Sequence, residues 1–206
     1  MLKKRKNKWI KQLRSPENWL STEQMRMIRM NIQNEMNDKR QVLMVTSPEE
    51  NQWQVLFSSK LASSFAEAGK KVLLVDMNFS RPIVHHLFGI RNENGLSNIL
   101  RGEEGRVTEA FIQNLDILPA GSFSSYLEGL DEIEQLISAW QRYYDVIILE
   151  TPAFLKSADS QILSLVCSGV ILVLQEGQTK EEDALEVKKI LERANTRLVG
   201  AVYQTN

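Results

Sequence analysis

The segment TSPEENQWQVLFSSKLA, residues 46–62, joins a hydrophobic run to an amphipathic run. Proteins that handle ATP keep a phosphate-binding loop at this position after a buried strand. Such a loop needs glycines that turn backbone N–H groups toward the phosphates, a lysine that neutralises them, and a hydroxyl that ligates Mg²⁺. Residues 46–62 contain no glycine, and their first lysine is Lys60. The segment has the position of a phosphate loop but lacks the glycines and the lysine that bind phosphate.

Hydrophobic runs that alternate with helix-period segments predict the elements around this loop. Such alternation is typical of an α/β fold: a three-layer, doubly wound, mostly parallel sheet covered by helices on both faces. Apolar residues recur at helical spacing in residues 55–68 and 130–143, and a further helix is expected from about Thr179, as its cap, to Ala194. The predicted strands are residues 41–47, 71–76, 115–120, 145–151, 169–175 and 198–204.

The carboxyl ends of parallel strands form the usual ligand-binding edge of such a sheet. We therefore expect the functional residues within four stretches. These are residues 46–56, 76–82, 120–130 and 150–154.

Charge is distributed unevenly along the 206 residues. Residues 1–14 hold seven of the 25 Lys and Arg and no acid, which leaves 18 basic against 26 acidic residues in the remainder. We therefore divide the chain into a basic N-terminal segment, 1–14, and a single domain, 15–206. From charge alone, the segment could meet anionic lipid or nucleic acid, or remain a solvated terminus. The single cysteine, Cys167, fits a reducing cytosol, and no run reaches the roughly 18 apolar residues that span a bilayer.

Six motifs follow one another along the chain: VTSPE, KKVLLVDMNFSRPIVHHLFGI, GLSNILRG, LDILPAG, YDVIILETP and ADSQIL. In their order and spacing they resemble the motifs of the cytoplasmic bacterial tyrosine kinases of capsule and exopolysaccharide synthesis, which are relatives of the MinD-type P-loop ATPases. The resemblance covers about residues 21–204 and implies the P-loop NTPase fold.

The resemblance places the family's phosphate loop, approximately G-E-G-K-S-T, on residues 51–56. Trp53 then stands in place of a glycine, Gln54 in place of the lysine, and Val55 in place of the hydroxyl that binds Mg²⁺. We expect nucleotide binding of the family type to be lost, and Trp53 to fill the vacated space. The degenerate loop comprises Asn51, Gln52, Trp53, Gln54, Val55 and Leu56.

Two acidic positions of the family are altered but not erased. The resemblance implies a D-x-D motif after the second strand, where Asp76 matches and Asn78 has lost the charge. It also implies an aspartate that supports Mg²⁺ at the end of a later strand, where this chain has Glu150. We treat Asp76 and Glu150 as vestigial catalytic residues and predict no metal site. The family's usual C-terminal tyrosine cluster has no counterpart in the ending AVYQTN.

Glu23, Arg26 and Arg29 match the spacing of the family's E-x-x-R-x-x-R oligomerisation motif. Residues three apart share a helix face, so the two arginines are expected to present a basic edge to the acidic surface of a neighbouring subunit. The alternative is a surface pair between Glu23 and Arg26, which contributes roughly 0.2–0.5 kcal/mol.

The basic segment adds apolar residues, among them Trp9, to its charges, as interfacial helices do. Family members are stimulated by the cytoplasmic tail of a membrane polysaccharide co-polymerase. We therefore expect the chain to lie in the cytoplasm at the inner face of the membrane, with that tail and an active paralogous kinase as partners, as a homo- or hetero-oligomer, and without nucleic acid. The residues expected to contact membrane or partner are Lys3, Lys4, Arg5, Lys6, Lys8 and Trp9.

Together these patterns predict a pseudokinase that regulates or scaffolds capsular or exopolysaccharide synthesis and needs no cofactor. Two alternatives stay open. The first is an active ATP-dependent tyrosine autokinase that uses Mg·ATP, Asp76 and Glu150. The second is a MinD-like membrane-positioning protein anchored by its basic segment.

Overall fold

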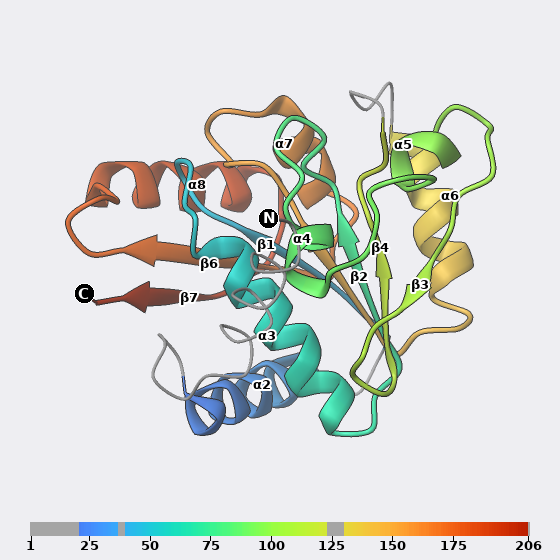
Figure 1. Cartoon of the computed structure of the whole chain (residues 1–206). Coiled ribbons are helices and arrows are strands. Elements are labelled where there is room, and N and C mark those ends of the chain that lie inside the picture. Colours follow the sequence, from blue (N-terminus) through green and yellow to red (C-terminus); the bar gives the residue numbers. More distant parts are fainter. Residues whose placement is uncertain (1–20, 37–39, 123–129, 206) are drawn as a thin grey trace, which may run out of the picture.

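A computed structural model describes residues 21–36, 40–122 and 130–205 (Figure 1). A seven-stranded sheet lies at the centre of this part of the chain, in the order β3-β4-β2-β5-β1-β6-β7. All neighbouring strands are parallel except β3 and β4. The strands are β1 (Gln41–Thr46), β2 (Val72–Asp76), β3 (Thr108–Glu109), β4 (Leu115–Leu118), β5 (Val146–Glu150), β6 (Gly169–Gln175) and β7 (Leu198–Gln204).

Two apolar layers cover the sheet and make it a three-layer α/β structure. Alternate residues of β1, for example Leu43 and Met44, belong to different layers, because successive side chains of a strand point to opposite faces. One layer includes residues of α2 (Thr22–Met36), α3 (Gln54–Glu67) and α4 (Val84–Phe88). The other includes residues of α5 (Leu96–Ile99), α6 (Leu130–Trp140), α7 (Ala158–Ser164) and α8 (Glu181–Arg193).

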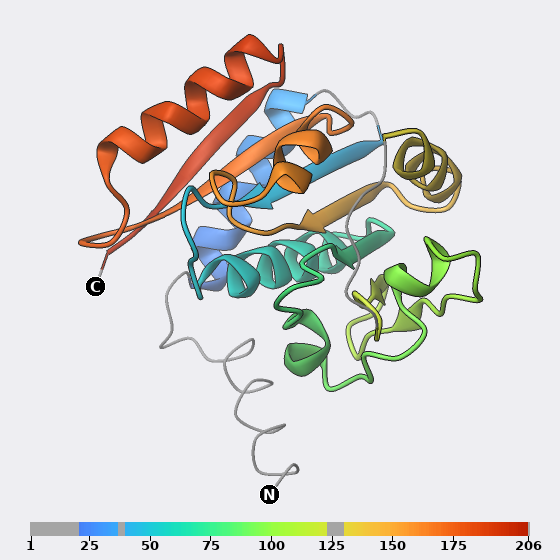
Figure 2. The same cartoon turned by 90° about the horizontal axis from the view of Figure 1, so that it is seen from above.

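The three central strands are buried at every position, which explains why their sequences are hydrophobic without alternation. On α3, Phe57, Leu61 and Phe65 are fully buried and form the predicted apolar stripe. In the view from above, α8 (red) and the segment with α4 and α5 (green) lie at opposite ends of the molecule (Figure 2).

The predicted strands are confirmed within two residues at each end, and the parallel, doubly covered sheet is confirmed. The two-residue strand β3 was not predicted. Thr179 is not the cap of α8: the helix begins after Lys180, and the Thr179 hydroxyl accepts a hydrogen bond from the Gln175 N–H.

Within the described residues, no helix is long and apolar enough to cross a membrane. The basic segment, residues 1–14, lies outside the described residues. The structure therefore leaves the expected contacts of Lys3, Lys4, Arg5, Lys6, Lys8 and Trp9 as predictions.

Candidate functional site

A cavity of about 650 Å³ opens beyond the carboxyl ends of β1, β2 and β5. This is the edge at which the parallel sheet was expected to bind its ligand. Three of the four predicted stretches contribute to its walls. The lining residues that the chemistry below uses are Glu50, Asn51, Gln54, Asp76, Arg81, Glu150, Lys156 and Asp159.

Gln54, the first residue of α3, is 4% exposed, and hydrogen bonds hold its side chain. Its Oε1 accepts from the Ser47 hydroxyl at 2.6 Å, and this hydroxyl shares its one proton with the Glu49 carbonyl oxygen, also at 2.6 Å. Its Nε2 donates to Glu150 Oε1 at 2.7 Å and to the Thr151 carbonyl oxygen at 2.6 Å. The carboxamide therefore joins the loop after β1 to the end of β5.

A further pair of hydrogen bonds strengthens this junction. The Thr151 hydroxyl donates to the Val45 carbonyl oxygen at 3.1 Å, and the Thr46 hydroxyl donates to the Pro152 carbonyl oxygen at 3.0 Å. Side chains from each strand end thus bind the backbone of the other.

The loop between β1 and α3 has a backbone unlike a glycine-rich anion nest. None of residues 47–53, all of them described, has a positive φ. Trp53 has φ −85° and ψ −18°, and its N–H donates to Asn51 Oδ1 at 2.8 Å. This Asx-type contact directs the Trp53 N–H toward the Asn51 side chain.

Trp53 does not line the cavity, so the expectation that its indole fills the space is wrong. Trp53, which directly precedes α3, is half-buried, whereas the Gln54 side chain points into the site. Of the other loop residues, Asn51, Gln52 and Val55 line the cavity, and Leu56 is buried in the helix. Lys60 is also buried on α3 and does not line the cavity, so it does not replace the missing lysine.

Asp76 is fully buried at the end of β2. Its Oδ1 accepts from the Asn78 N–H and its Oδ2 from the N–H groups of Ile83 and Val84, each at 3.1 Å. Burial raises the pKa of Asp76 to about 7, although these three hydrogen bonds favour the ionised form. The carboxyl thus anchors the chain that leads into α4.

Glu150 is the Cα partner of Asp76 across the β2–β5 pair and is 4% exposed. Burial raises its pKa to about 8; the polar side chains of Ser58 and Gln54 oppose this shift, and the charge of Asp76 adds to it. Its Oε1 accepts from Gln54, whereas Oε2 has no hydrogen-bond partner among the described residues. The structure brings together the two predicted acids, but gives them an amide neighbour where the family has a cation.

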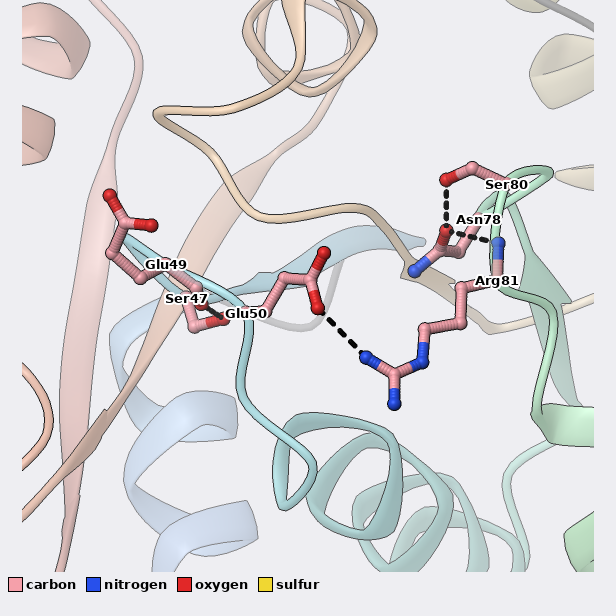
Figure 3. A network of polar contacts seen from close by, with 6 residues as sticks. All are labelled: Ser47, Glu49, Glu50, Asn78, Ser80 and Arg81. Carbon is pink, nitrogen blue, oxygen red and sulfur yellow. Dashed lines mark hydrogen bonds and ion pairs between the residues drawn. The ribbon is translucent and has the colours of Figure 1, made fainter.

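Ion pairs join the loops at the rim. Arg81 Nη1 lies 2.8 Å from Glu50 Oε2, and Lys156 Nζ lies 3.1 Å from Glu49 Oε1. Figure 3 shows the first pair beside Asn78, whose Oδ1 accepts from the Ser80 hydroxyl and the Arg81 N–H. These side chains are largely exposed, so each pair contributes at most about 1 kcal/mol. Both cations at the rim, Arg81 and Lys156, therefore already have acidic partners.

The candidate interface residues lie on α2, away from the cavity lining. Glu23 and Arg26 are exposed and 4.0 Å apart, as the surface-pair alternative describes. Arg29 is half-buried, and its Nη1 donates to Gln33 Oε1 at 3.0 Å. The oligomer interface therefore stays a prediction.

Known proteins are similar to this chain in sequence and in fold. The tyrosine-protein kinase YwqD of Bacillus subtilis is 33% identical over 195 residues, which cover 89% of the chain and 80% of that protein. The chain belongs to the bacterial tyrosine kinase family. The kinase domain of the Escherichia coli tyrosine kinase Etk, at 25% identity, has a TM-score of 0.83 over 90% of this chain and 75% of that one.

The cell division ATPase MinD of Pyrococcus furiosus is 19% identical, with a TM-score of 0.69 over 80% of this chain and 71% of that one. This likeness agrees with the predicted P-loop NTPase fold. No family model matches the chain.

Sequence reasoning identified the loop and both acids but missed how they are joined. Position in the motif indicated that Gln54 lacks a positive charge, yet nothing in the sequence indicated that its carboxamide would bind Glu150. The rim partners Glu49, Glu50 and Lys156 were also missed, because they belong to loops far apart in the sequence. In the described part of the chain, no group of three or more His, Cys, Asp or Glu is placed to hold a metal ion.

The two buried acids predict that stability falls as pH rises. Because both folded-state pKa values lie above the ordinary values of 3.8 and 4.5, the folded protein holds more protons than the unfolded chain until pH exceeds about 8. We expect the free energy of unfolding to drop by about 2–3 kcal/mol between pH 6.5 and 8.5. Urea titrations across this window measure it. Burial and His86 lower the folded-state pKa of His85 to about 4, so loss of the proton from its unfolded imidazole near pH 6.5 opposes the drop by only about 0.4 kcal/mol.

The substitution Glu150→Gln should reduce this drop to below about 1 kcal/mol, because a neutral amide releases no proton. Glu134→Gln, an exposed position on α6, is the matched control and should keep the full drop. A flat profile for the unaltered protein would show that neither acid is protonated near neutral pH.

Proposed function

We propose that this member of the tyrosine kinase family acts by binding rather than by phosphoryl transfer, as a regulatory or scaffold partner in capsular or exopolysaccharide synthesis at the membrane. The observation that carries the proposal is the hydrogen-bonded Gln54 carboxamide, which stands where the family has its phosphate-binding lysine.

The residues present do not fit Mg·ATP. A phosphate entering the loop would find no lysine there, and the Trp53 N–H already donates to Asn51 Oδ1. Hydrogen bonds to charged groups contribute about 1.5–3 kcal/mol each, so losing two or three of them removes at least about 4 kcal/mol. That loss moves a micromolar affinity into the millimolar range.

The acids fit a metal poorly as well. Both oxygens of Asp76 accept backbone N–H groups, and one oxygen of Glu150 is bound to Gln54. Mg²⁺ requires near-ideal octahedral geometry at about 2.0–2.1 Å, and these hydrogen bonds leave the two carboxyls few free lone pairs with which to meet it. Val55 also supplies no hydroxyl.

The proposed partners follow from what the chain keeps. The scaffold of the kinase domain is intact, and the exposed Glu23 and Arg26 are available for contact with another subunit. The basic segment is suited to anionic lipid, with about 1 kcal/mol for each Lys or Arg near the surface. We propose that the chain binds the cytoplasmic tail of a membrane polysaccharide co-polymerase, an active paralogous kinase, or both.

One observation favours the active kinase as a second candidate. A carboxyl whose pKa is near 7, such as Asp76, is suited to general-base chemistry at neutral pH. The same titration with nucleotide distinguishes the two candidates.

Calorimetric titration with Mg·ATP tests the proposal. We expect no heat of binding at micromolar concentrations and a dissociation constant in the millimolar range or weaker. An intact kinase of the family under the same conditions is the positive control. A dissociation constant below about 10 µM would overturn the proposal in favour of the active kinase.

Removal of residues 1–14 tests the membrane part of the proposal. The shortened protein should move from the membrane fraction to the supernatant in vesicle sedimentation with anionic lipid, because it loses seven positive charges. A variant in which only Trp9 becomes Ala keeps the charges and should keep most of the binding. Equal sedimentation of the full and shortened proteins would exclude the segment as the anchor.

A further inference from the structure

We propose that the cavity beyond β1, β2 and β5 binds a basic side chain carried on a peptide, an ammonium or guanidinium group that is seated against Glu150. This inference rests on the proposed loss of nucleotide binding and names the ligand class that the altered site takes instead.

The charge of the cavity favours a cation. Its lining contains four acids, Glu50, Asp76, Glu150 and Asp159, against two bases, Arg81 and Lys156. Both bases are held at the rim by Glu50 and Glu49. The carboxyls at the strand ends therefore have no cationic partner among the described residues. Once ionised, above their raised pKa values of about 7 and 8, they attract a cation and repel an anion.

Glu150 supplies the specific contact. The residue is buried, lines the cavity, and leaves Oε2 without a hydrogen-bond partner among the described residues. A buried acceptor without a donor costs free energy, and an ammonium or guanidinium group supplies both the donor and the charge. Gln54 has already bound Oε1, so one oxygen of this carboxyl is left for a ligand.

Asn51 indicates that the cation belongs to a peptide. Its Nδ2 is a buried donor without a partner among the described residues, and Asn51 lines the same cavity. This atom needs an acceptor, which a free polyamine does not have. A basic residue within a peptide has both groups, the cation and its backbone carbonyl oxygen. Volume is no obstacle, because about 650 Å³ is within the usual range for ligand sites.

An organic cation fits better than a metal ion. No group of three or more His, Cys, Asp or Glu in the described residues is placed to hold a metal ion. A single oxygen of Glu150 is enough for an ammonium group, whereas a divalent ion requires several oxygen ligands at once.

The test follows amide chemical shifts of the full-length protein by NMR during titration with acetyl-Gly-Lys-Gly-amide. We expect saturable shifts at residues around the cavity, with a dissociation constant at least 10-fold weaker in Glu150→Gln and unchanged in Glu134→Gln. Gln54→Lys should abolish binding, because its own ammonium group then reaches Glu150. Folding of each variant is checked by the dispersion of its amide spectrum.

Three further arms separate the sources of a signal. Spermidine should bind more weakly than the tripeptide, and equal or tighter binding would overturn the peptide part of the inference. MgCl₂ should not displace the tripeptide at equal concentration, and displacement would show that the site takes a metal ion. Mg·ATP added to the same sample tests the proposed function separately. If neither the tripeptide nor Mg·ATP binds, the present inference is wrong and the proposed function stands. If Mg·ATP binds tightly, both are wrong.

Discussion

The hydrogen bonds of one carboxamide connect the parts of this site. Gln54 accepts from Ser47 on the loop after β1 and donates to Glu150 and Thr151 at the end of β5. A lysine at this position would place a positive charge beside Glu150, whereas the carboxamide is neutral and offers both a donor and an acceptor. The glutamine therefore satisfies both sides of the junction within the protein and requires no ligand to hold it in place.

The loss of a positive charge changes the electrostatics of the strand ends. Asp76 and Glu150 keep the positions of acids in a kinase site, but burial raises the pKa of each because no neighbouring cation offsets desolvation. Near pH 7 the site is therefore partly protonated. The same change underlies the proposed loss of phosphate binding and the proposed binding of a basic group.

The sequence predicted the sheet well because its central strands are buried on both faces. Continuous runs such as those ending at Asp76 and Glu150 admit few other structures, and their positions also located the site. The strand β3 was missed because a two-residue pairing carries no periodic signal. Side-chain direction was harder to predict: the bulk of Trp53 suggested a plug, but hydrogen bonding selected the smaller Gln54 for the interior.

The loop conformation was predictable only in part. The lack of glycine correctly indicated that no nest of positive-φ residues would form in residues 47–53. The turn in which Asn51 accepts the Trp53 N–H depends on local competition for donors, which composition does not determine. The rim pairs depend on loops from three strands meeting, so they required the folded structure.

A crystal structure of the chain grown with Mg²⁺ and a non-hydrolysable ATP analogue tests most directly whether the Gln54 carboxamide has replaced phosphate binding. It should show the Gln54 amide between Ser47 and Glu150, with no triphosphate against the loop. Triphosphate density beside residues 51–56, with Gln54 turned away from Glu150, would contradict it.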